Sequence, residues 1–113
     1  MLVLGIDPGT AITGYGLVKD TRDGLQVVDY GVILTPKDLP LHQRLFQLHT
    51  ELTKIILLHH PDAGAVEKLF FQRNVTTAMS VGHARGVVFL AMAQACMPVA
   101  EYTPMQVKEA VAG

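Results

Sequence analysis

The chain has 113 residues, of which 50% are hydrophobic and 17% are charged. This is the length and composition of one globular domain rather than of a disordered segment. The net charge of -1 disfavours the strongly basic class of general nucleic-acid binders. No apolar stretch reaches the roughly 18 residues of a membrane span, and the amino terminus lacks the pattern of a signal peptide, so we expect a protein without membrane association.

Three strands are predicted first, over residues 2–7, 13–18 and 25–34. The sequence Asp7-Pro8-Gly9-Thr10 has turn composition, and Asp23-Gly24 is typical of a hairpin. Such short connections predict an antiparallel meander.

A one-faced helix is predicted over residues 41–59, because its apolar residues recur at spacings of three and four and Pro61 follows. These residues are Leu41, Leu45, Leu48, Leu52, Ile55 and Ile56. A short apolar run then ends at Glu67, and a long helix is predicted from about residue 75 to 97. The single cysteine, Cys96, is expected to pack inside the protein.

A strand over residues 98–102 and a new helix from Pro104 are predicted at the end of the chain. Thr103 and Gln106 match a capping box around that proline.

Two carboxylates, Asp7 and Glu67, each end an apolar run. A right-handed crossover after the meander most simply places the fourth strand parallel to the first and beside it. Neighbouring strands lie about 5 Å apart, so the two side chains could share a divalent cation. The carboxyl ends of parallel strands, where the strand order reverses, are also where open sheets keep their ligands.

Each of these residues also has a plainer interpretation. Asp7 could be a turn residue whose carboxylate accepts backbone N–H groups, and Glu67 could be the point where a strand meets water. Gly14 and Gly16 share one strand face, where they would form a bulge or leave room for a metal or substrate near Asp7.

Five motifs together resemble the RuvC Holliday junction resolvases, and they are collinear over the whole chain. They are LGIDPGT from Leu4, TGYG from Thr13, AVE from Ala65 with Phe70, GHARG from Gly82 and PMQVK from Pro104. His83 stands where members of the family often carry Gln. The resemblance implies a ribonuclease H-like α/β fold with a central mixed sheet, in which antiparallel strands 1-2-3 are followed by parallel strands 4 and 5, with helices on both faces.

The resemblance also implies a function and its partners. The expected activity is that of a crossover junction endodeoxyribonuclease, a hydrolase that cuts two strands of like polarity at a four-way DNA junction in recombination and repair. We expect a homodimer in the bacterial cytoplasm that works with the RuvA and RuvB branch-migration proteins. The implied cofactor is Mg²⁺, two ions per complete site, with Mn²⁺ as a possible substitute.

Carried over residue by residue, Asp7 and Glu67 match the catalytic, metal-binding acids of the first and fourth strands. Phe70 matches the family aromatic that stacks on an unpaired base, and Arg73 and Lys108 match positions that are often basic and suit phosphate contacts.

Two further acids of the family come from a final helix that this sequence lacks. We therefore expect residues 1–113 to form a single ribonuclease H-like domain that is incomplete at its C-terminus. The hypothesis that follows is that this chain binds magnesium weakly and cuts slowly or not at all.

Other functions remain open at this point. The chain could be a non-catalytic junction-binding fragment, or a related ribonuclease H-like nuclease acting on ribosomal RNA precursors. More remotely, the Asp-Pro-Gly-Thr turn is similar to the first phosphate loop of actin and Hsp70-type ATPases. In the long helix, Ala78, Gly82 and Gly86 recur every fourth residue and predict close packing against the sheet or a second copy.

Overall fold

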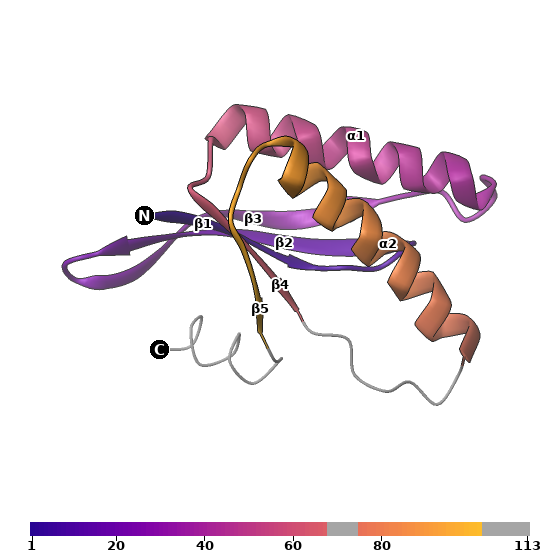
Figure 1. The fold of residues 1–113 in the computed structure, drawn as a ribbon, viewed down its shortest axis with the longest axis horizontal. Helices are drawn as coiled ribbons and strands as arrows, with labels where there is room; N and C mark the ends of the chain where they lie inside the picture. The colour runs from indigo at the N-terminus through magenta and orange to yellow at the C-terminus, as the bar shows by residue number, and fades with distance from the viewer. Residues whose placement is uncertain (68–74, 103–113) are drawn as a thin grey trace.

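The computed structural model describes residues 1–67 and 75–102, which form a five-stranded sheet and two helices (Figure 1). The elements in chain order are β1 (Leu2–Asp7), β2 (Ile12–Thr21), β3 (Gly24–Leu34), α1 (Leu41–His59), β4 (Ala63–Glu67), α2 (Val75–Gln94) and β5 (Val99–Tyr102). Every predicted strand and both long helices are present. Strands β2 and β3 extend nearer to their hairpin than predicted.

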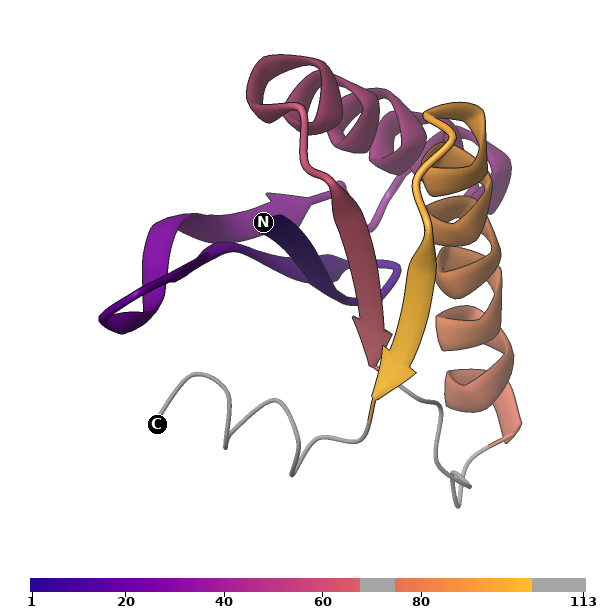
Figure 2. The ribbon, with the colours of Figure 1, turned by 60° about the vertical axis from the view of Figure 1, so that its left-hand side comes forward.

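The strand order in the sheet is β3-β2-β1-β4-β5. Strands β1, β2 and β3 pair antiparallel, whereas β4 pairs parallel to β1 and β5 parallel to β4. The predicted meander and the return of the fourth strand beside the first are both confirmed. The chain makes that return through α1, and Figure 2 shows β4 and β5 side by side with α2 next to them.

Both described helices pack on one face of the sheet. Side chains alternate between the two faces along a strand, so Leu4 and Ile6 of β1 point to the same side. They are fully buried in one cluster with Leu52 of α1 and Val88 of α2. We expected helices on both faces; the helix predicted from Pro104 lies outside the described residues.

The two helices end in the same way, with a residue in the left-handed conformation. His60 follows α1 with φ 50°, and its N–H donates to the carbonyl of Ile56 at 2.9 Å. Cys96 follows α2 with φ 57°, and the N–H of Met97 donates to the carbonyl of Met92 at 3.0 Å. This closure is a Schellman motif, which ends α2 three residues before the predicted Met97.

The prediction that Cys96 packs inside the protein is wrong. Cys96 is exposed, in the turn that follows the end of α2 at Gln94.

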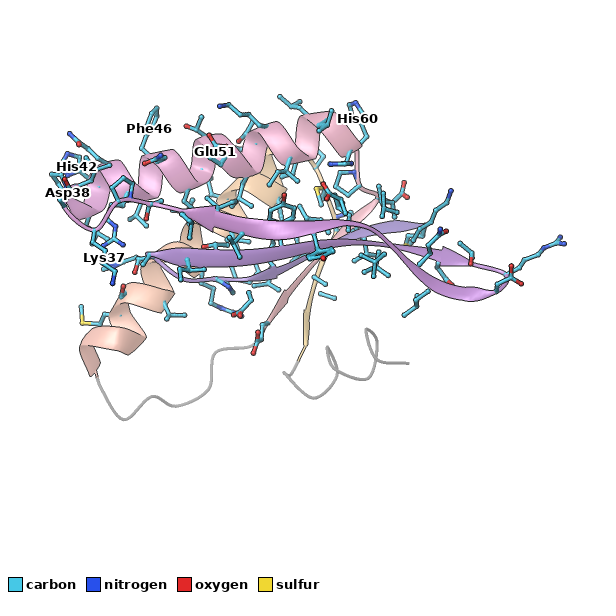
Figure 3. All side chains as sticks on the ribbon, turned by 180° about the vertical axis from the view of Figure 1, so that it is seen from behind. Lys37, Asp38, His42, Phe46, Glu51 and His60 are labelled. Carbon is cyan, nitrogen blue, oxygen red and sulfur yellow. The ribbon has the colours of Figure 1, made fainter. Side chains whose placement is uncertain are left out.

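The opposite face of the sheet and the outer side of α1 carry exposed apolar side chains. On β3, Tyr30, Val32 and Leu34 are exposed, and on α1 Phe46 points away from the sheet (Figure 3). In the described part of the chain, neither helix has the length and apolar character to cross a membrane.

Candidate functional site

The carboxyl groups of Asp7 and Glu67 lie together at the end of the sheet. β1 and β4 are parallel neighbours whose last paired residues are Ile6 and Val66. The next residue on each strand is an acid. Ile6 and Val66 are buried on the face that the helices cover. Because side chains alternate along a strand, both acids lie on the opposite face. The structure therefore brings together the two side chains that the sequence singled out.

Three causes raise the pKa of the Glu67 carboxyl above its usual 4.5, and burial of the half-buried side chain is the largest. The second is repulsion from the negative charge of Asp7, and the third is a hydrogen bond between the two carboxyl groups. The two carboxyl groups are thus close enough to affect each other's charge. Two like charges at this separation also favour a cation between them.

This donor set fits a hard divalent ion. Carboxylate oxygens are the ligands that Mg²⁺ prefers, and Mg²⁺ keeps several waters when a protein supplies only one or two of them. Within residues 1–67 and 75–102, no cluster brings together three or more acidic, histidine or cysteine side chains. The described site is therefore a pair of carboxylates with open coordination positions, of the kind that catalytic metals use.

The turn after Asp7 is held by Thr13 rather than by the aspartate. The Thr13 hydroxyl donates to the carbonyl of Gly9 at 2.6 Å and accepts the N–H of Gly9 at 3.2 Å. Among the described residues, no backbone N–H donates to the Asp7 carboxylate. Within the described residues, the turn is therefore held by the Thr13 side chain and not by the Asp7 carboxylate.

Glycines allow the close backbone packing around Asp7. A Cβ on Gly9 would lie 2.2 Å from the carbonyl oxygen of Ile12, so no other residue fits in this turn. Gly14 pairs with Asp7 across the β1–β2 ladder, and a Cβ there would lie 3.8 Å from the Cβ of Asp7. Gly14 thus adjoins the site as predicted, although an alanine at this position would make only ordinary contact.

Helix α2 contacts the ends of both strands that carry the acids. The Ser80 hydroxyl hydrogen-bonds the hydroxyl of Thr10, in the turn that follows Asp7. Nη1 of Arg85 donates to the backbone carbonyl of Glu67. Sequence analysis identifies Arg85 only as part of the GHARG motif, and it does not single out Ser80.

The predicted DNA contacts Phe70, Arg73 and Lys108 lie outside the described residues. In α2, a Cβ added to Gly82 or Gly86 would meet nothing within 4 Å. These two glycines therefore do not pack against the sheet, which was one of the two neighbours expected for them.

Comparison with known proteins gives consistent matches over the whole chain. A family model described as crossover junction endodeoxyribonuclease RuvC matches residues 3–113. A protein of that name from Desulfitobacterium hafniense is 57% identical over 113 residues, which are 100% of this chain and 68% of the relative. Its namesake from Desulforamulus reducens is 52% identical over all of this chain and 69% of its own length.

A solved structure also matches over nearly the whole chain. The structure of T. thermophilus RuvC in complex with a Holliday junction substrate superposes with a TM-score of 0.89 at 35% identity, covering 99% of this chain and 72% of that one. The chain therefore spans about two thirds of the length of the relatives that it matches.

Proposed function

The chain belongs to the RuvC family of crossover junction endodeoxyribonucleases, and from this membership we propose that its Asp7–Glu67 pair serves metal-dependent hydrolysis of Holliday junctions. The ribonuclease H-like fold and the nuclease class follow from the family. The juxtaposition of the two carboxyl groups at neighbouring strand ends is the observation that carries the assignment of the site.

We assign distinct duties to the residues of this site. Asp7 and Glu67 hold Mg²⁺, or Mn²⁺ in its place, and two ions would occupy the complete centre. Bound metal supplies an activated water and offsets the charge that develops on the phosphate oxygens. Thr13 and Gly9 fix the turn from which Asp7 projects. Gly14 keeps the space beside Asp7 free of a side chain.

DNA binding involves Phe70, Arg73 and Lys108 in this proposal. Phe70 stacks on a base that is unpaired at the crossover, and the two cations contact phosphates. Phosphate contacts release counterions, so junction affinity should fall as salt rises.

We also propose a homodimer that forms through the outer side of α2. Its Met79 and Leu90 are 59% and 52% exposed, and Gly82 and Gly86 lie between them at spacings of three and four. An apolar stripe with small residues at its centre allows a second helix to approach closely. A two-fold pair of sites suits a junction with two equivalent strands. Work with RuvA and RuvB and a place in the bacterial cytoplasm extend the same proposal.

The test compares this chain with a variant that lacks one metal ligand. We expect the chain to bind a synthetic four-way junction more tightly than a linear duplex of equal length. Asp7→Asn should leave that binding within a few-fold but lower any Mg²⁺-dependent cleavage at least about 100-fold, because metal stabilisation is worth several kcal/mol. Asp23→Asn, in the exposed β2–β3 hairpin, is the matched control and should change neither. Equal affinity for junction and duplex would contradict the proposal.

The rate of cleavage by residues 1–113 is a separate expectation. Two carboxylates fill only part of an octahedral shell, so we expect weak magnesium binding and cleavage that is slow or absent. Single-turnover assays should compare the cleavage rate of residues 1–113 with that of the Desulfitobacterium hafniense relative. Equal rates would disprove the expectation.

A further inference from the structure

Helix α2 holds both strand ends of the proposed metal site. Its Ser80 hydroxyl reaches Thr10, three residues after Asp7, and its Arg85 guanidinium reaches the carbonyl of Glu67 itself. The two anchoring residues stand little more than one turn apart on the same helix. A rigid element thus joins two backbone segments that are distant in the sequence.

The carbonyl that Arg85 holds is at a weak point of the sheet. The ladder between β1 and β4 ends at the pair Ile6 and Val66, so Glu67 lies just beyond it on the side of Asp7. A strand end without ladder pairing on one side frays more easily than the strand interior. The guanidinium supplies a hydrogen bond at this position.

The Arg85 side chain is itself held in place. Its Cζ lies 4.9 Å from the ring centroid of Phe89, one helical turn further along, and Phe89 packs against the core. A guanidinium over an aromatic face gains cation–π attraction. Because its planar group is already oriented, it loses little side-chain entropy when it forms a hydrogen bond. The donor to Glu67 therefore has a fixed direction.

The Asp7 side has a matching support. Besides Ser80, the Thr35 hydroxyl donates to the carbonyl of Thr10, and Nε of Arg44 donates to that hydroxyl at 3.3 Å. The turn that follows Asp7 is thereby fastened between α1 and α2.

We propose that Arg85 is a positioning residue for the metal site, with Ser80 as its counterpart on the Asp7 side, so that α2 sets the separation of the two carboxyl groups. This inference rests on the proposed function, because it requires that Asp7 and Glu67 bind a divalent ion. Groups that orient metal ligands typically change metal affinity 10- to 100-fold when removed.

The experiment is a Mg²⁺ titration of the ¹⁵N-labelled chain followed by NMR, which reads out metal binding without catalysis. The amide signals of Asp7, Gly14 and Glu67 report a dissociation constant at the site. We expect Arg85→Gln to raise this constant about 10- to 100-fold. Arg22→Gln, the same change in the exposed β2–β3 hairpin, is the control and should leave it unchanged.

Two milder variants keep the test decisive should Arg85→Gln fail to fold. Arg85→Lys retains a cationic donor and should restore most of the affinity, although a lysine lacks the planar fork. Ser80→Ala should weaken binding less than Arg85→Gln, since Thr35 still holds the turn.

The outcomes separate this inference from its premise. Signals at Asp7 and Glu67 that do not respond to Mg²⁺ in the unaltered chain would overturn the metal site and this inference with it. A normal response there, together with an unchanged constant in the Arg85 variants, would overturn the positioning role alone. A lower melting temperature at constant affinity would show that Arg85 only stabilises the fold.

Discussion

The carboxyl groups of Asp7 and Glu67 repel each other in the folded protein when both are ionised. Burial and the charge of Asp7 raise the pKa of the Glu67 carboxyl, so the folded state holds its proton more tightly than the unfolded chain does. The associated stability is complete below the usual pKa of 4.5 and is lost as the pH rises through the higher folded-state value. At neutral pH the repulsion between the two carboxylates thus destabilises the fold, and a cation bound at the proposed site would offset it.

We expect Glu67→Gln to raise the free energy of unfolding at pH 7, because it removes this repulsion. The gain should be less than about 1 kcal/mol, since solvent screens a partly exposed carboxyl, and it should vanish below about pH 4. Urea unfolding across this pH range measures the effect. Saturating Mg²⁺ should stabilise the unaltered protein but not the variant.

The control for this prediction is Glu51→Gln. Glu51 pairs with Lys54 at 3.1 Å on the exposed side of α1, where an ion pair contributes about 0.5 kcal/mol or less. A lower free energy of unfolding for Glu67→Gln at pH 7 would contradict the claim that the two carboxylates repel each other.

The sequence predicted the acids of the site but not the residues that hold them. Asp7 and Glu67 could be found because each follows an apolar strand, and the strand order could be inferred from connection lengths. Arg85 bonds a backbone carbonyl, which any residue provides, so no sequence pattern identifies its partner. Cys96 was misjudged because its exposure depends on where α2 ends, and a left-handed cysteine gives no glycine signal for that end.

At the level of elements, β4 and α2 come close together at Gly64. A Cβ on Gly64 would lie 2.4 Å from Sδ and 2.7 Å from Cε of Met92, which is buried. The glycine therefore lets α2 approach β4, the strand that ends in Glu67. The sequence predicted both elements, but not the close contact between them at Gly64 and Met92.

Gly64→Ala should lower the free energy of unfolding by about 1–3 kcal/mol, the usual range for overpacking a core. Thermal and urea unfolding measure it. Gly16→Ala is the matched control in β2, because an added Cβ there meets nothing within 4 Å, and it should be nearly neutral. Equal effects of the two substitutions would show that the Met92 contact does not decide the cost.

For the whole molecule, the two sides of α2 have different neighbours. One side packs with Ala84 and Val88 against the core, and the other exposes Met79 and Leu90. Helices that are apolar on all sides are usually buried on all sides. In the proposed dimer, the second copy covers the outer side of the same helix that holds the metal site.

Leu90→Glu should therefore weaken self-association at least about tenfold, which corresponds to about 1.4 kcal/mol. Sedimentation equilibrium distinguishes the dimer from the 12.3 kDa monomer. Leu58→Glu places the same charge on an exposed leucine of α1 and should leave association unchanged. An unaltered chain that is monomeric at high concentration would refute this interface.

The parallel pairing of β1 with β4 also has a kinetic consequence. The β1–β2–β3 meander can form by local pairing, whereas β4 reaches β1 only after the chain has passed through two strands and α1. Closing so long a loop costs entropy before any contact compensates for it. We therefore expect the two acids to meet late in folding, and a magnesium ion at the proposed site would favour molecules in which that closure has taken place.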